Sequence, residues 1–220
     1  MDEKTRIASG TLLRVYADID LLALELCTDR LPFAPSAKAR KELMDQINEE
    51  VIHFSIQDRT LEKLQMPFTP VLTLEKRREI KEWFSNQDWL GFLAGLQLGI
   101  EGIGIAIVEM VSKHADPIIQ ESLRIPIIDE KRQTSFGVLE WNEFLSSCTA
   151  QEKEQQLKRV LDIFEEIYLL TEAALPIRFE DYWGALGLKK EDLWETVRER
   201  TILILENAGF EPALPASFVA

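Results

Sequence analysis

An acidic residue in the middle of the most apolar stretch of the chain sets the main constraint on the fold. Residues 89–110 are mostly apolar, and Glu101 lies near the centre of this stretch with glycines on both sides. An ionised carboxylate is costly at the centre of a bilayer, and neither end of the stretch carries a close cluster of positive charge. We therefore predict a buried helix of a bundle rather than a membrane span. The carboxylate then needs a partner, a proton or a metal ion.

Helix signals dominate the rest of the sequence, and no segment alternates strongly enough to predict a strand. Ser36, Asp88 and Asp116 are typical N-cap residues. The helix that begins at Thr149 is expected to end at Pro176, and the tail after Pro212 has no predicted structure. Together these signals predict helices at residues 9–30, 37–64, 74–84, 89–114, 117–147, 149–175 and 190–207.

The helix lengths predict an all-α fold, an antiparallel four-helix bundle. Short turns join helix 9–30 to helix 37–64 and helix 89–114 to helix 117–147, so each pair should form an antiparallel hairpin. The segment between the two hairpins is long enough to cross the bundle. Two extra C-terminal helices would pack outside. We find no flexible linker, so we expect one domain over residues 1–220, with a core at 9–147 and accessory helices and a tail at 148–220.

Several acids lie where helical periodicity predicts burial. Asp20 has apolar neighbours one turn before and after it, and Glu50 shares the inner face of its helix with Leu43, Ile47 and Phe54. Asp18 lies on a polar stripe that we assign to solvent, although the choice between Asp18 and Asp20 as the inward acid stays open at this stage. We expect Glu42, Asp45 and Glu49 on the outer face of the second helix.

The spacing of the acids predicts that they meet in one layer. Asp20 and Glu50 are 30 residues apart, and Glu101 and Glu130 are 29 apart, with the turn of each hairpin close to midway. Residues equidistant from the turn of an antiparallel hairpin lie at equal height. Four buried acids at one height repel one another strongly. Two divalent metal ions would neutralise them.

Histidine and glutamine complete the pattern. His53 follows Glu50 by three residues, so both side chains point the same way, which is the Glu-x-x-His spacing of dimetal bundles. Glu130 and Gln133 repeat this spacing with an amide in place of imidazole. His114 lies at a helix end beside the second turn, and we expect it at the surface.

This arrangement resembles the ferritin-like superfamily, and within it the diiron oxidases and the small subunit of ribonucleotide reductase. Residues 129–137, Asp-Glu-Lys-Arg-Gln-Thr-Ser-Phe-Gly, look like the Asp-Glu-x-Arg-His segment, often ending in Phe-Gly, of the fourth helix of such oxidases. Residues 49–54, Glu-Glu-Val-Ile-His-Phe, look like their second-helix motif. The resemblance covers residues 9–147 and implies a ferritin-like bundle.

The resemblance also implies a set of metal ligands. Asp20 and Glu101 would be single carboxylate ligands, and Glu50 and Glu130 would bridge two metal ions. His53 would bind one metal through a ring nitrogen. Iron is the metal expected at both positions, with manganese as the alternative.

Three further residues have expected roles. Asp129 matches an acid that steadies a ligand. Gln133 departs from the oxidase pattern, and an amide oxygen is a weaker ligand than imidazole, so the second metal should bind more weakly. Tyr16 lies one turn before Asp20 and is a candidate catalytic residue that holds a radical or gates electrons. The alternative is a core tyrosine hydrogen-bonded to a carboxylate.

These features together predict a dimetal oxidoreductase that activates O₂ and oxidises a small organic substrate. A hydrophobic pocket beside Gly99, Gly102 and Gly104 would hold that substrate. One alternative is a ferritin-like protein that oxidises and stores iron, which Gln133 favours because ferritins often carry glutamine there. Another alternative is a degenerate scaffold that binds little metal.

Charge and cysteine content limit the possible binding partners and the cellular compartment of the protein. A net charge of −13 disfavours binding to DNA or RNA over most of the surface. Two cysteines do not make a disulfide framework, and the first residues lack the apolar core of a signal peptide, so we expect a cytoplasmic protein with no membrane partner. An electron-donor protein and a second copy of the chain, forming a homodimer, remain open as partners.

Overall fold

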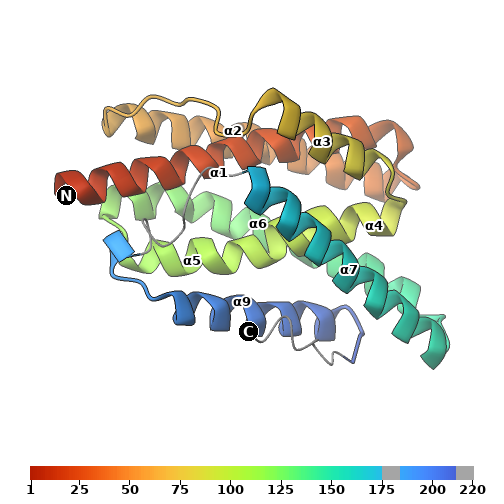
Figure 1. Ribbon diagram of the computed structural model, residues 1–220. Helices are drawn as coiled ribbons and strands as arrows, with labels where there is room; N and C mark the ends of the chain where they lie inside the picture. Colours follow the sequence, from red (N-terminus) through yellow and green to blue (C-terminus); the bar gives the residue numbers. More distant parts are fainter. Residues whose placement is uncertain (175–183, 212–220) are drawn as a thin grey trace.

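The computed structural model describes residues 1–174 and 184–211, and no residue in these ranges forms a strand (Figure 1). The predicted helix end at Pro176 and the predicted tail after Pro212 lie outside the described residues. The described helices are α1 (Glu3–Arg30), η1 (Leu31–Phe33), α2 (Ala37–Lys63), α3 (Leu74–Ser85), α4 (Trp89–Leu93), η2 (Ala94–Ile103), α5 (Gly104–His114), α6 (Pro117–Ser146), α7 (Ala150–Ala174), η3 (Gly184–Leu186) and α9 (Lys190–Asn207).

Capping residues explain where the bundle helices begin. The side chains of Ser36, Asp88 and Asp116 each accept a hydrogen bond from a backbone N–H two or three residues later, as the sequence predicts. Helix α1 begins earlier than the predicted start at Ser9, because Asp2 caps it in the same way. The start of each of these helices is therefore determined by a capping residue close to it in the sequence.

Two antiparallel hairpins form the predicted bundle. Helix α1 packs along α2, and the helix made of α4, η2 and α5 packs along α6, while α2 and α6 join the two hairpins. The loop after α2 and helix α3 lead from one hairpin to the other (Figure 1). Helix α7 crosses the bundle diagonally, and α9 runs alongside α5 outside the four-helix core (Figure 1). The prediction of a four-helix bundle with a crossover and further C-terminal helices is confirmed.

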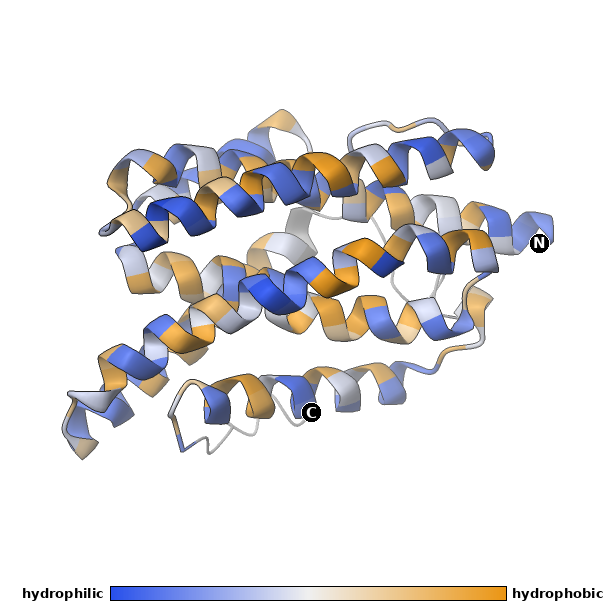
Figure 2. Ribbon diagram, turned by 180° about the vertical axis from the view of Figure 1, so that it is seen from behind, coloured by the Kyte–Doolittle hydropathy of each residue, from blue (hydrophilic) through white to orange (hydrophobic). Residues whose placement is uncertain are grey.

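The long apolar helix is the core of this bundle. Residues Trp89–His114 form a run of 26 residues that is long and apolar enough to cross a membrane, yet 72% of its most apolar window is buried inside the protein. Hydrophilic and hydrophobic residues alternate along the helices (Figure 2), and most of the buried side chains are hydrophobic. The run therefore contacts protein along most of its length.

This run is not one continuous α-helix, and in that respect the sequence prediction is wrong. Its central part, Ala94–Ile103, is a π-helix of 10 residues that contains Glu101. Gly95, Gly99 and Gly102 lie in this part. Each glycine lowers the preference for the α-helix by about 1 kcal/mol relative to alanine. Such π segments are rare and frequently occur at functional sites.

Two other helices, α9 and α6, approach the π-helix closely at Gly102. A Cβ atom at this position would lie 2.9 Å from Ile204 Cδ1 and 3.0 Å from Thr134 Cγ2. Gly102→Ala is therefore expected to destabilise the protein by about 1–3 kcal/mol, because the packed side chains of Ile204 and Thr134 must move to admit the methyl group. Chemical unfolding followed by circular dichroism measures this change.

Gly104 provides the matched control, because a Cβ there would meet no described atom within 4 Å. Gly104→Ala should leave stability unchanged or raise it by up to about 1 kcal/mol through helix propensity. Equal destabilisation by the two substitutions would contradict the close approach at Gly102.

Candidate metal centre

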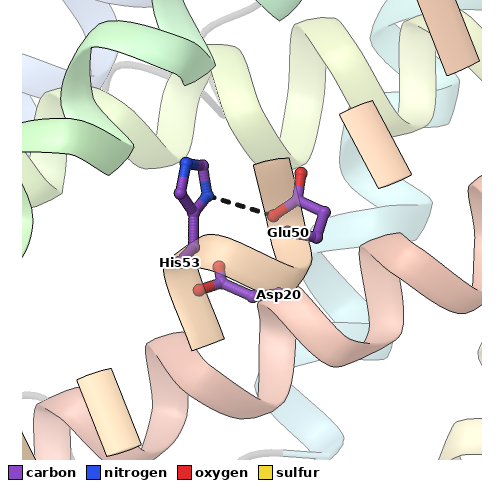
Figure 3. Close-up of side chains that lie close together, drawn as sticks. All are labelled: Asp20, Glu50 and His53. Carbon is purple, nitrogen blue, oxygen red and sulfur yellow. Dashed lines mark hydrogen bonds and ion pairs between the residues drawn. The ribbon is translucent and has the colours of Figure 1, made fainter. Parts of the chain in front are cut away.

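Three potential ligands from two helices form a compact buried group. Asp20 lies on α1, and Glu50 and His53 lie one turn apart on α2 (Figure 3). All three are buried, and one potential ligand atom of each lies within 4.8 Å of the other two. His53 Nδ1 lies 3.2 Å from Glu50 Oε2 (Figure 3). The sequence predicted that these three residues face the same interior space.

Two further acids lie beside this group. Glu101 projects from η2 and Glu130 from α6, and they are 6% and 8% exposed. The Gln46 amide connects Glu101 to Glu50, because its Nε2 lies 3.2 Å from Glu101 Oε1 and 3.4 Å from Glu50 Oε1. The predicted layer therefore brings together acids from all four core helices. Their role as metal ligands is taken up as a proposal below.

Burial makes this cluster of acids electrostatically unfavourable. Burial, and next the charge of Glu50, raises the pKa of Asp20 and that of Glu101 well above their ordinary values. The same two causes raise the pKa of Glu130 to about 8. Each shift favours the protonated carboxyl group over the buried carboxylate, unless a cation takes the place of the proton.

Burial has the opposite effect on the pKa of His53. Burial alone would lower its pKa, but the hydrogen bond and the charge of Glu50 outweigh burial and raise the pKa to about 10. Its second nitrogen, Nε2, lies 3.0 Å from Asp129 Oδ2. A ligand histidine commonly donates its second ring N–H to a carboxylate, which fixes the ring orientation. Asp129 therefore lies beside the outer nitrogen of His53, and Nδ1 is the nitrogen that lies near Glu50.

Gln133 lies beside Glu50 on the neighbouring helix α6. Its Nε2 donates to Glu50 Oε1 at 3.1 Å and to Glu49 Oε2 at 3.0 Å. Its Oε1 is buried and has no hydrogen-bond partner in the part of the chain that the structure describes. A buried oxygen without a partner is unfavourable. In this arrangement the amide nitrogen of Gln133, rather than this oxygen, faces Glu50.

The donor set fits a pair of divalent metal ions. It offers four buried carboxylates, an imidazole whose outer nitrogen is already paired, and an amide oxygen without a partner. Carboxylate and imidazole groups are the ligands found in dimetal bundles. A metal pair would also remove the repulsion that raises the pKa values of the acids.

Glutamines around the cluster were missed by the sequence analysis. Gln57 Nε2 donates to Asp20 Oδ2 at 2.7 Å, and Gln97 Nε2 donates to Gln46 Oε1 at 3.1 Å. Helical spacing could have found two of them, since Gln46 lies four residues before Glu50 and Gln57 seven residues after it. These neutral amides orient the carboxylates without adding charge.

Tyr16 is close to the cluster but not bonded to it. Its hydroxyl is buried and has no hydrogen-bond partner among the described residues. Burial, and next the charge of Glu130, raises the pKa of this hydroxyl. The alternative prediction, a tyrosine hydrogen-bonded to a carboxylate, is therefore wrong. His114 is exposed, as predicted, with Nδ1 3.0 Å from the carbonyl oxygen of Met110.

Asp18 does not face solvent, which corrects the assignment of the polar stripe. It is 1% exposed and accepts hydrogen bonds from the backbone N–H groups of Val71 and Leu72, at 2.7 and 2.6 Å. It also pairs with Arg77 of α3. The crossover covers this side of α1, which the periodicity of α1 alone could not reveal. Asp18 thus holds the crossover, and Asp20 is the inward acid.

The outer face predicted on α2 is also partly covered. Arg132 of α6 pairs with Glu42, and its Nη2 lies 2.7 Å from Glu49 Oε2. The Glu42 and Glu49 side chains are only 13% and 18% exposed. The prediction that they lie on an outer face is wrong, because α6 packs against that side of α2.

Side chains fill the space that the sequence analysis assigned to a substrate. Ile204 of α9 and Thr134 of α6 occupy the notch at Gly102, and the ring of Phe164 of α7 lies 3.6 Å from where a Cβ at Gly99 would be. The prediction of an open pocket beside these glycines is not confirmed. It failed because the C-terminal helices pack onto the glycine face.

Comparison with known proteins identifies the fold. No protein-family model and no curated protein matches the chain. Among solved structures, the chain is similar to "Protein 19 with aldehyde deformylating oxidase activity from Synechococcus" at 17% identity. The TM-score is 0.73, and the match covers 99% of this chain and 97% of that one. The described part of the chain thus has the ferritin-like helical fold.

Proposed function

We propose that this chain is a dimetal oxidoreductase that uses O₂ to oxidise a small organic substrate. The observation that carries the proposal is the buried group of Asp20, Glu50 and His53, with ligand atoms within 4.8 Å of one another. Glu101 and Glu130 lie beside it in the same bundle. Buried charges of this kind are stable in proteins when they coordinate metals.

Each residue has a defined part in this proposal. Asp20 and Glu101 would each hold one metal ion, Glu50 and Glu130 would lie between the two, and His53 would bind through Nδ1. Two iron ions, or manganese with iron, would supply the electrons that reduce O₂. Asp129 would accept a hydrogen bond from the Nε2–H of His53, so that Nδ1 could bind a metal ion in exchange for its own proton. Gln46 and Gln57 hold Glu101 and Asp20 in place.

The similar structure supports an oxidase in general terms. That protein is described as having aldehyde deformylating oxidase activity, and the present chain has the same fold. We assign no aldehyde specificity, because Ile204 and Phe164 fill the space beside Gly102 and Gly99 of η2 in this chain. The proposal stays at a small organic substrate, and an electron-donor protein would supply the reducing electrons.

Gln133 favours a second candidate function, the oxidation and storage of iron. Glutamine in place of a second histidine would give one weakly held metal ion that can be released. A protein of this kind assembles into a large cage, whereas an oxidase is small. Measurement of particle mass by light scattering separates the two candidates.

Metal loading tests the proposal directly. After anaerobic loading with Fe(II) and desalting, elemental analysis is expected to give about two metal ions per chain. Mössbauer spectra after addition of O₂ should then show oxidation of a coupled iron pair. Glu50→Ala removes the central carboxylate and serves as the binding-deficient control. Well under one metal ion per parent chain would refute the oxidase function.

A further inference from the structure

The C-terminal helix α9 packs directly onto the π-helix that carries Glu101. Thr201, Ile204 and Leu205 of α9 are buried, and Ile204 fills the notch that Gly102 leaves. Helix α9 is outside the four-helix core and lies about a hundred residues later in the chain than η2. Its contact with η2 nevertheless falls at the residue that follows Glu101.

A side-chain hydrogen bond joins α9 to the backbone at the same place. Arg200 Nε donates to the carbonyl oxygen of Gly102 at 2.9 Å. The acceptor is a backbone oxygen rather than a carboxylate, so this bond restrains the backbone conformation of η2 at Gly102. Arg198, two residues earlier, instead pairs with Glu195 on its own helix. Arg200 therefore binds the backbone of η2, whereas Arg198 binds only a side chain of its own helix.

The π-helix has little preference of its own for one backbone conformation. Gly99, Gly102 and Gly104 flank Glu101, and glycine has more accessible backbone conformations than any other residue. A small rotation at Gly102 would move the Glu101 carboxylate relative to Asp20 and Glu50. Contacts from outside the segment must therefore fix its conformation. The hydrogen bond from Arg200 to the Gly102 carbonyl oxygen is such a contact.

We propose that Arg200 is a positioning residue for Glu101, and that helix α9 through this bond sets the affinity of the metal ion that Glu101 holds. The metal part of this inference rests on the proposed function. The structural part, that Arg200 orders the π-helix, does not. The C-terminal helix is then a component of the metal centre rather than an accessory.

Arg200→Met removes the hydrogen-bond donor but keeps most of the apolar stem. In metal-free protein, amide hydrogen exchange over residues 94–107 is expected to become about tenfold faster. Calorimetric titration with Fe(II) under anaerobic conditions should show one of the two metal ions bound at least about tenfold more weakly, with the other unchanged. Arg200→Lys, which can still donate to the carbonyl, should restore part of both properties.

Arg198→Met is the matched control, with the same chemical change on the same helix. It should leave exchange and metal affinity as in the parent. Arg200→Leu, which also lacks a donor, replaces Arg200→Met if circular dichroism shows that the Met variant loses helix content. Parent-like exchange in the Arg200 variant, or faster exchange with both metal affinities unchanged, would overturn the positioning role. A parent that binds no metal would instead overturn the proposed function, while the exchange data still decide whether Arg200 orders the π-helix.

Discussion

Glu101→Gln is expected to abolish binding of at least one metal ion while making the metal-free protein more stable than the parent at neutral pH. The substitution keeps the shape of the side chain and removes a ligand charge. It also removes a buried ionisable group that is repelled by Glu50, Glu130 and Asp20. Removing this buried, repelled charge should raise the free energy of unfolding of the apoprotein by an amount on the order of 1–3 kcal/mol. Metal analysis and chemical unfolding of the apoprotein measure the two effects.

The sign of the pH dependence follows from the direction of the pKa shift. Burial, and next the charge of Glu50, raises the pKa of Glu101 above its ordinary value of 4.5. The folded state then binds the proton more tightly than the unfolded chain, so parent stability falls as pH rises from 4.5 through the folded pKa. The advantage of Glu101→Gln should therefore be present at neutral pH and disappear below the ordinary pKa.

Glu109→Gln is the control for this experiment. Glu109 is an acid on α5, close to Glu101 in sequence, but its side chain is 34% exposed and pairs with Lys131. Surface ion pairs contribute little to stability, so Glu109→Gln should change neither metal content nor the free energy of unfolding appreciably. A large loss of apoprotein stability in Glu101→Gln would show that the carboxylate has a structural partner, with Gln46 the first candidate.

Gln133→His is expected to tighten the weaker of two unequal metal sites by about tenfold or more. In the parent, the metal ion nearer His53 should bind first, because imidazole is a better ligand than a carboxamide for iron and manganese. A histidine at residue 133 stands three residues after Glu130, as His53 stands after Glu50. Calorimetric titration of the parent and the variant resolves the two affinities.

A surface histidine on the same helix controls for nonspecific metal binding. Ser135 is exposed on α6, so Ser135→His adds an imidazole away from the cluster. It should leave both affinities as in the parent. Two equal sites in the parent, or no gain in Gln133→His beyond that control, would mean that Gln133 does not face a metal ion. Its hydrogen bonds to Glu49 and Glu50 would then be its whole role.

The sequence was sufficient to predict the bundle and the composition of the cluster, because both depend on local regularities. Helical spacing placed Glu50 and His53 on one face, and the symmetric distances from the turns placed Asp20 and Glu130 at the height of their partners. Capping residues such as Asp88 defined where the helices begin. These rules need no knowledge of distant contacts.

The predictions about solvent-facing and open surfaces failed because they depended on which distant segment covers a helix face. Asp18 was placed in solvent because α1 alone does not reveal that the crossover binds it. The pocket at Gly102 was left open because nothing near it in sequence indicates Ile204. The π-helix was not predicted because its conformation depends on packing by the distant helices α7 and α9 as well as on local glycines.

The division of the cluster between two hairpins has a consequence for how the chain folds. Asp20, Glu50 and His53 come from the first hairpin, and Glu101 and Glu130 come from the second. Each hairpin forms through contacts that are local in sequence, which favours rapid formation. The acids of the two halves meet only when the hairpins dock, so this late step brings the repulsion into the folding pathway. Divalent cations should accelerate docking, and alkaline conditions without them should slow it.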